Sequence, residues 1–191
     1  MNKLIFATNN LNKLKELRFA VKHFNIIGLK DINILEEIPE TGNTLKANAL
    51  QKAKYIYEKT GLDCFADDTG LEVEALDGRP GLYSARYAGP NCDSKENISK
   101  VLKELGSLKN RRAAFKTVIA LIIDGKEYFF EGEVEGKILK VKRGTGGFGY
   151  DPIFQPNGYT NSFAEMSLEL KNKIGHRGNA VKKLVMFLNK V

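Results

Sequence analysis

The sequence is poor in the residues that zinc-binding and disulfide-bonded proteins use. It has only two cysteines and two histidines among 191 residues. The cysteines, Cys64 and Cys92, are in no metal-binding spacing and cannot form a disulfide framework. Too few histidines are present to complete a zinc centre. We therefore exclude zinc and expect a protein of a reducing, cytoplasmic compartment.

Long apolar runs are also missing. No stretch approaches the roughly 20 apolar residues that a membrane-spanning helix needs. The N-terminal run of residues 4–7 is too short for the apolar region of a signal peptide. Repeats, low-complexity tracts and long linkers are absent as well. We therefore expect neither membrane insertion nor secretion.

Positive charge is what the sequence has in excess, with a formal net charge of +7. The basic residues are scattered, and pairs such as Arg111-Arg112 are not part of a longer run. Scattered positive charge favours a small polyanion in a pocket over a duplex along a surface. A nucleotide is therefore the expected kind of partner.

Strand and helix signals alternate in the first half of the chain, and a long hairpin signal follows. Asp124-Gly125 is a strong turn signal between two long strands. The expected N-caps are Thr44 or Asn43 for the second helix and Ser94 for the third. This order indicates an α/β domain with a mixed sheet. We expect strands at 3–8, 25–29, 63–68, 112–123 and 127–139, and helices near 11–23, 44–57, 94–105, 165–174 and 177–189.

The stretch ATNNLNKLKE lies where the first strand gives way to the first helix. A helix N-terminus offers N–H groups and a favourable dipole to an anion. Thr8, Asn9 and Asn10 can donate as well, and Lys13 lies in the first helical turn. The stretch therefore indicates a phosphate site, although an ordinary capped helix with a surface lysine gives the same pattern.

A glycine-rich stretch, RGTGGFGYDPIF, contains the pattern G-x-G-x-x-G at residues 144–149. In dinucleotide-binding folds that pattern opens a helix after a strand. Here Pro152 follows three residues later, so we expect a loop instead of a helix. The absence of a following Gly-Lys-Ser/Thr excludes a P-loop. The loop presents Phe148 and Tyr150, whose rings can stack on a base.

The stretch NKIGHRGNA contains one of the two histidines. Gly175 is expected to end one helix, and His176 with Arg177 to begin another. Such a pair offers several donors to a carbonyl or a phosphate, and Lys171 can join it from the preceding helix. The other histidine, His23, is expected to have only a structural role near the end of the first helix.

Two adjacent acids, Asp67 and Asp68, end the apolar stretch DCFADD. Their burial is costly unless a metal ion, a basic partner or solvent compensates them. Asp-Thr-Gly is also the aspartic-protease triplet, but a flanking acid disfavours the shared proton of that dyad. Magnesium explains the pair better, because it takes carboxylates together with substrate phosphates. Glu40 is a candidate second ligand, and a role of Asp67 as ligand stays open.

Five stretches together resemble the inosine/xanthosine triphosphate pyrophosphatases, which remove non-standard purine nucleoside triphosphates. They follow one another in the family's order and cover the chain almost end to end. The stretches are ATNNLNKLKE, PETGNTLKANALQKA, ADDTGLEVEALDGRPGLYSARYAG, GTGGFGYDPIF and FAEMSLELKNKIGHRGNA.

The resemblance implies an elongated, mixed-sheet α/β fold whose two lobes flank a central nucleotide-binding cleft. It implies a single nucleoside-triphosphate pyrophosphatase domain over residues 1–191. The expected reaction is hydrolysis of dITP, ITP and XTP to the nucleoside monophosphate and pyrophosphate. The resemblance also implies Mg²⁺ as cofactor and a homodimer, with no membrane or nucleic-acid partner required.

The resemblance further implies roles for individual residues. Asp68 is the expected general base and, with Glu40, the expected magnesium ligand, and Lys13 is the second expected catalytic residue. Two positions depart from the family pattern, which often has glycine in place of Asn9 and usually serine in place of Gly175. The expected substrate-binding residues are Thr8, Asn9, Asn10, Lys13, Thr69, Phe148, Gly149, Tyr150, Asp151, Lys171, His176 and Arg177.

Two other functions stay open at this level. A pyrophosphatase of related fold with a preference for pyrimidine or modified nucleotides would share the phosphate and metal residues. A non-enzymatic nucleic-acid-binding protein would explain the positive charge without any need for Glu40 or Asp68. The latter predicts strong, salt-dependent affinity for a duplex.

Overall fold

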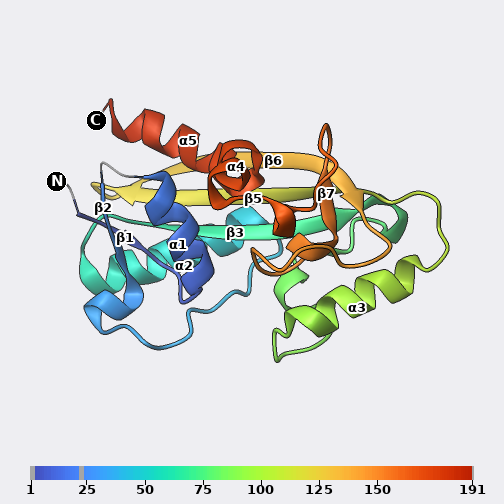
Figure 1. The fold of residues 1–191 in the computed structure, drawn as a ribbon. Coiled ribbons are helices and arrows are strands. Elements are labelled where there is room, and N and C mark those ends of the chain that lie inside the picture. Colours follow the sequence, from blue (N-terminus) through green and yellow to red (C-terminus); the bar gives the residue numbers. More distant parts are fainter. Residues whose placement is uncertain (1–2, 22–23, 191) are drawn as a thin grey trace. The chain divides into compact units, whose positions relative to one another are not determined.

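The computed structural model describes residues 3–21 and 24–190, and Figure 1 shows it as a ribbon. The chain folds into two compact units. Two of the points where the chain passes from one unit to the other, after Asp68 and after His176, fall inside stretches predicted to carry function. Unit 1 comprises Met1–Asp68, Thr117–Gly132 and Arg177–Val191, and unit 2 comprises Thr69–Lys116 and Glu133–His176.

The strands form one mixed sheet. Its order is β2-β1-β3-β5-β6-β7, and β4 pairs with β3 beside this path. β1 is parallel to β2 and to β3, whereas β4 is antiparallel to β3 and β7 is antiparallel to β6. The predicted mixed-sheet α/β class is therefore confirmed. The strands are β1 (Lys3–Phe6), β2 (Asn25–Gly28), β3 (Cys64–Val73), β4 (Pro80–Gly81), β5 (Arg112–Ile123), β6 (Lys126–Ile138) and β7 (Phe154–Pro156).

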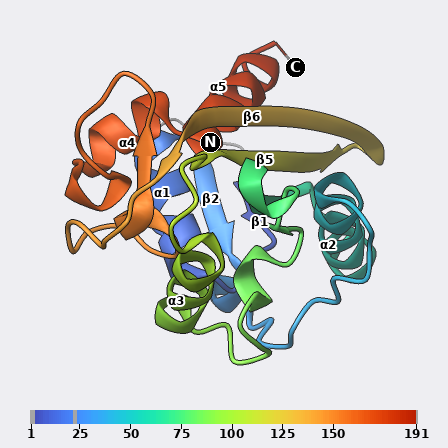
Figure 2. The ribbon, with the colours of Figure 1, turned by 90° about the vertical axis from the view of Figure 1, so that its right-hand side faces the viewer.

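Unit 1 has helices on both faces of its strands: α1 (Leu11–Ala20), α2 (Leu45–Thr60) and α5 (His176–Leu188), whose first residue belongs to unit 2. Leu4 and Phe6 of β1 pack with α1 and α5, whereas Ile5 packs with α2. This division follows from the alternation of side chains along a strand. Figure 2 shows α1 and α2 on opposite sides of β1 and β2.

Unit 2 contains α3 (Ser94–Leu105) and α4 (Leu168–Ile174). Its core combines apolar residues from the second half of β3, from α3 and from the start of β5. Three phenylalanine rings lie at its centre, with Phe154 at 4.7 Å from Phe115 and 5.1 Å from Phe163 between ring centroids. This aromatic core supports the loop and helix that carry the predicted base-binding residues.

Several local predictions are confirmed. Strand β5 has the predicted ends, and Asp124 and Gly125 form the hairpin turn with positive φ angles of 49° and 73°. Thr44 caps α2, because its side chain accepts a hydrogen bond from the N–H of Ala47. Gly175 ends α4, as expected, although its backbone is extended.

Other local predictions are wrong. Strand β3 continues through the two acids to Val73. The cap of α3 is Asp93, whose side chain accepts from two backbone N–H groups, and not Ser94. Helix α1 ends at Ala20, and His23, the predicted end, lies outside the described residues. Helix α4 begins at Leu168 because a separate 3-10 turn occupies residues 163–165.

None of the helices formed by residues 3–21 and 24–190 is long and apolar enough to cross a membrane. The chain forms two compact units, and the prediction of one pyrophosphatase domain over residues 1–191 stays a prediction.

Candidate active site

Asp67 and Asp68 are neighbours in β3 but belong to two different clusters of side chains. Successive strand residues point to opposite faces of a sheet. Phe65, two residues before Asp67, packs in the core cluster of α1 and α5, whereas Ala66, two residues before Asp68, packs in the cluster of α2. The two carboxylates therefore point to opposite faces, which keeps these like charges from facing each other.

Asp67 is 1% exposed and is compensated by two basic side chains. Its Oδ1 accepts a hydrogen bond from Lys13 Nζ at 2.9 Å, and its Oδ2 accepts one from Arg177 Nε at 2.9 Å. Burial alone would raise the pKa of Asp67, but the charges of Lys13, Arg177 and Lys52 outweigh it and lower that pKa. Asp67 is therefore an ionised, buried counter-ion.

Glu16 of α1 extends this cluster. Arg177 Nη1 lies 2.5 Å from Glu16 Oε2, and both side chains are almost completely buried. Burial lowers the pKa of Lys13 by more than the charge of Asp67 raises it. Arg177, expected from the sequence to bind the base, is thus held by two carboxylates of unit 1.

Asp68 lies among polar side chains of α2. Its Oδ2 accepts a hydrogen bond from Asn48 Nδ2 at 3.1 Å, and its Oδ1 lies 3.8 Å from Lys52 Nζ. Burial raises the pKa of Asp68, the charges of Lys52 and Lys13 oppose this shift, and Glu40 adds to it. The net shift of the pKa is upward, which makes Asp68 a stronger base than an exposed aspartate.

The loop that carries Glu40 is held against the same face of α2. Lys52 Nζ lies 2.5 Å from Glu40 Oε1, and the N–H of Gly42 donates to Asn48 Oδ1 at 2.8 Å. A Cβ atom on Gly42 would lie 2.7 Å from that of Ala47, so this close approach requires glycine. The helix therefore places Glu40 and Asp68 around one ammonium group.

The surroundings of Asp68 fit a hard cation such as magnesium in their donor chemistry. Glu40 and Asp68 supply carboxylate oxygens that already approach one cation, the ammonium of Lys52. Magnesium usually takes one or two carboxylates together with phosphate oxygens and water. Within the described part of the chain, no group of three or more His, Cys, Asp or Glu side chains could hold a metal ion. The residues therefore fit a metal that a substrate helps to hold.

The predicted phosphate loop forms a regular helix cap. Asn10 Oδ1 accepts hydrogen bonds from the N–H groups of Asn12 and Lys13 at 3.0 and 3.1 Å. The Asn10 N–H donates to Thr8 Oγ1 at 3.1 Å, and Asn9 Nδ2 donates to a backbone carbonyl 27 residues further along the chain. Lys13 points from this cap to Asp67, so the loop and the acid pair are joined within unit 1.

In unit 2, an ion pair between Lys171 and Asp151 joins α4 to the glycine-rich loop. Both residues are almost completely buried. Asp151 Oδ2 also accepts a hydrogen bond from the N–H of Phe148 at 2.8 Å, and Lys171 Nζ lies 4.7 Å from the centre of the Phe148 ring. Three of the predicted base-binding residues are therefore brought together.

The remaining residues predicted to bind the base or the substrate also belong to unit 2. His176 is buried and stacks on Phe115. Tyr150 is buried too, and its hydroxyl donates to the Ser84 carbonyl at 2.8 Å, which ties the loop to residues 84–86. Gly149 takes a φ of 60°, a conformation that favours glycine. Thr69 follows Asp68 in β3 and is partly buried.

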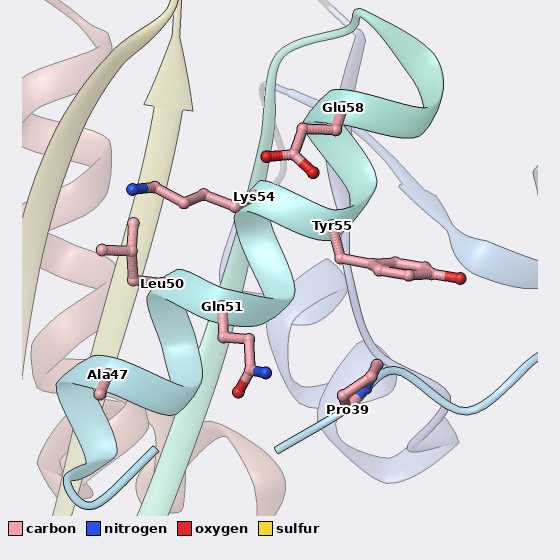
Figure 3. Close-up of a pocket in the computed structure, with 7 residues that line it drawn as sticks. All are labelled: Pro39, Ala47, Leu50, Gln51, Lys54, Tyr55 and Glu58. Atoms are coloured by element: carbon pink, nitrogen blue, oxygen red, sulfur yellow. The ribbon is translucent and has the colours of Figure 1, made fainter. Parts of the chain in front are cut away.

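A separate hollow of about 430 Å³ lies on another face of α2, where Figure 3 shows Pro39 opposite the helix. It contains none of the predicted site residues, so we assign it no part in the chemistry. Its lining residues are Pro39, Ala47, Leu50, Gln51, Lys54, Tyr55 and Glu58.

Sequence reasoning missed Asn48, Lys52 and Glu16 as members of these clusters. Asn48 and Lys52 are four residues apart and lie on one face of α2, directly beside the buried Ala49 and Ala53. Polar residues on the buried side of an alanine-rich helix were the signal available for the first two. Glu16 carried no comparable signal, because its partner Arg177 is 161 residues away.

The chain is similar to known proteins along almost its whole length. The model of the Ham1 family matches residues 4–187. The chain is 53% identical to the dITP/XTP pyrophosphatase of Flavobacterium johnsoniae, over 97% of each chain. It is 55% identical to the dITP/XTP pyrophosphatase of Porphyromonas gingivalis, over 98% of each. The structure of the Staphylococcus aureus Ham1 protein is similar, with a TM-score of 0.89 and 38% identity over 99% of each chain.

Proposed function

Because the chain belongs to the Ham1 family, we propose that it hydrolyses dITP, ITP and XTP to the nucleoside monophosphate and pyrophosphate. The observation that carries this proposal is the identity of more than half of the residues, along almost the whole chain, with dITP/XTP pyrophosphatases. The chain is then a hydrolase of acid-anhydride bonds in nucleotide metabolism. Its expected effect is to remove non-standard purines from the nucleotide pool.

We assign the handling of the triphosphate to residues of unit 1. Lys13, with Thr8, Asn9 and Asn10 at the start of α1, contacts the phosphates. Glu40 and Asp68 would hold Mg²⁺, which supplies positive charge where the leaving pyrophosphate develops negative charge. The helix cap of Asn10 keeps this loop in shape before a substrate binds.

Asp68 is the proposed general base. Its carboxylate takes a proton from the attacking water while the water oxygen bonds to the α phosphorus. The bond from that phosphorus to the bridging oxygen breaks, and pyrophosphate leaves with the electron pair. In the metal-free protein, burial shifts the pKa of Asp68 upward, and the efficiency of a general base increases as its pKa approaches the working pH.

We assign recognition of the base to residues of unit 2. Lys171 and His176 donate to the 6-oxo group of hypoxanthine and xanthine, and the Phe148 ring stacks on the base. Adenine presents a donor at that position, and a missed buried hydrogen bond costs about 1–3 kcal/mol. Asp151 orients Lys171, while Thr69, Gly149 and Tyr150 shape the surroundings. Arg177 of unit 1 is also assigned to substrate binding, and its ion pair with Asp67 holds its guanidinium group in position.

The resemblance also supports three finer statements about the protein. We propose that it is a homodimer, that it works in the cytoplasm, and that residues 1–191 make a single functional domain. The cysteine content is consistent with a reducing compartment.

Product analysis tests the proposed function. Purified protein and Mg²⁺ are incubated in parallel with dITP, XTP, dGTP, dATP and dUTP, and in ¹⁸O-labelled water for dITP. We expect monophosphate and pyrophosphate from dITP and XTP, with the label in the monophosphate. Release of orthophosphate would overturn the mechanism, and cleavage of dUTP alone would overturn the purine preference. No turnover together with salt-dependent duplex binding would favour a nucleic-acid-binding protein.

A further inference from the structure

Two buried aromatic rings contact the polar residues to which we assign base recognition. Phe115 belongs to β5 and is 5% exposed, and Phe163 belongs to the 3-10 turn before α4 and is 1% exposed. Neither ring carries a group that could donate a hydrogen bond to a nucleotide or accept one from it. What these rings can do is set the position of their polar neighbours.

Phe115 sets the plane of the His176 ring. The two ring centroids are 4.7 Å apart, and the planes differ by only 23°. Such stacking covers a face of the imidazole, whereas the two ring nitrogens lie in the ring plane and take no part in it. The contact therefore restricts the direction of the nitrogens without using their hydrogen-bonding capacity.

Phe163 contacts both polar residues. Its ring centre lies 5.7 Å from Lys171 Nζ and 6.5 Å from the centre of the His176 ring. An ammonium within about 6 Å of a ring centre is attracted by the ring's negative face. Phe163 also stacks at 6.2 Å on Phe115, so the two rings form one support under Lys171 and His176.

We propose that Phe115 and Phe163 are positioning residues that determine selectivity for 6-oxo purines by fixing His176 and Lys171. The inference rests on the proposed function, in which these two side chains donate to the base. Hydrogen bonds weaken steeply as their angle departs from linearity, so a donor that can swing discriminates poorly between an acceptor and a donor on the base. Groups that bind a substrate are precise only when neighbouring side chains lock them.

Phe154 offers a matched control for both rings. It is completely buried in the same core and contacts Phe115 and Phe163. Leucine at each of the three positions removes a ring from one core. Variants Phe115→Leu and Phe163→Leu disturb the support directly, whereas Phe154→Leu reports the general cost of losing a ring.

Proton NMR tests the positioning without any substrate. The chain has only two histidines, so His23→Gln identifies the imidazole signals of His176. Protons above an aromatic face are shifted upfield, and we expect this shift for His176. It should be lost in Phe115→Leu and kept in Phe154→Leu. An equal response of the two variants would overturn the positioning role of Phe115.

Steady-state kinetics with dITP and dATP test the selectivity. In Phe115→Leu and Phe163→Leu we expect the ratio of kcat/KM for dITP over dATP to fall about tenfold, through a higher KM for dITP at similar kcat. Phe154→Leu should keep the native ratio. Unchanged ratios in the first two variants would overturn the inference while leaving the proposed function intact. Failure of the native protein to hydrolyse dITP would instead overturn both.

Discussion

On one face of β3, Asp67 lies 2.9 Å from both Lys13 Nζ and Arg177 Nε; on the other, Asp68 lies 3.1 Å from the Asn48 amide and 3.8 Å from Lys52 Nζ. The first carboxylate is closely ion-paired and has a lowered pKa, whereas the second is more loosely held and has a raised pKa. Two adjacent residues of one type thus have separate tasks.

The comparison shows how a strand can place a carboxylate that destabilises the fold beside one that stabilises it. Alternation along β3 gives each carboxylate its own surroundings, so the network that neutralises Asp67 does not neutralise Asp68 to the same degree. Pairs of acids whose environments push their pKa values apart are typical of sites that perform acid–base chemistry. We therefore assign a stabilising role to the Asp67 carboxylate and the chemistry to the Asp68 carboxylate.

The largest effect is expected for turnover in Asp68→Asn. Loss of a general base lowers rates by about 10²–10⁴-fold. The amide oxygen of the new side chain can still accept from Asn48, so the fold should be kept. The kcat for dITP, measured beside nucleotide binding by calorimetry, checks this expectation. Near-native turnover would show that Asp68 is not the base.

The next effect is expected for stability in Asp67→Asn. The substitution leaves the partly buried Lys13 and the buried Arg177 with one carboxylate fewer, and breaking a buried ion pair costs about 3–5 kcal/mol. Urea unfolding measures the change in the free energy of unfolding. Glu127→Gln is the matched control, because its pair with Lys54 is largely exposed and should contribute less than about 1 kcal/mol. Equal effects of the two variants would contradict the role of Asp67.

A smaller effect on both properties is expected for Asn48→Ala. Asn48 is 1% exposed and joins Gly42 of the Glu40 loop to Asp68. Its loss leaves the partly buried N–H of Gly42 without its acceptor, and an unsatisfied buried group costs about 1–3 kcal/mol. It should also lower kcat, because Glu40 and Asp68 lose their shared support. Lys54→Ala, which removes a largely exposed ion pair with Glu127 from the same helix, should change kcat little in the same assay.

The smallest effect is expected in the pH dependence of stability without metal. The lowered pKa of Asp67 means that its contribution is complete above the ordinary aspartate pKa of about 3.9 and is lost as pH falls through the lowered value. The raised pKa of Asp68 has the opposite sign, so its cost appears as pH rises above about 4. Urea unfolding between pH 2 and 8 should therefore show two separate windows. As pH rises toward about 4 the native protein gains stability relative to Asp67→Asn, and as pH rises above about 4 it loses stability relative to Asp68→Asn.

Much of the fold could be predicted because its signals are local. The ends of β5 and the Asp124-Gly125 turn depend on neighbouring residues, and both were predicted correctly. The predicted end of β3 was wrong because two adjacent acids resemble the end of a buried strand. The strand continues because partners 54 and 110 residues away compensate Asp67, and no local pattern contains them.

The candidate site was predictable in its residue types but not in its division of tasks. The sequence left open a metal ion, a basic partner or solvent as compensation for the two acids. The structure gives Asp67 two basic partners and leaves Asp68 with Asn48 and Lys52. Alternation along a strand would have separated the two carboxylates already at the level of sequence. The partners themselves depend on tertiary packing.

The most direct test of separate tasks compares the free energies of unfolding of Asp67→Asn and Asp68→Asn with that of the native protein. The measurement uses urea without metal at pH 7, which is far above the ordinary aspartate pKa. The account predicts opposite signs, with a marked loss of stability for Asp67→Asn and a gain for Asp68→Asn. Similar losses in the two variants would contradict it, because both acids would then serve the same purpose.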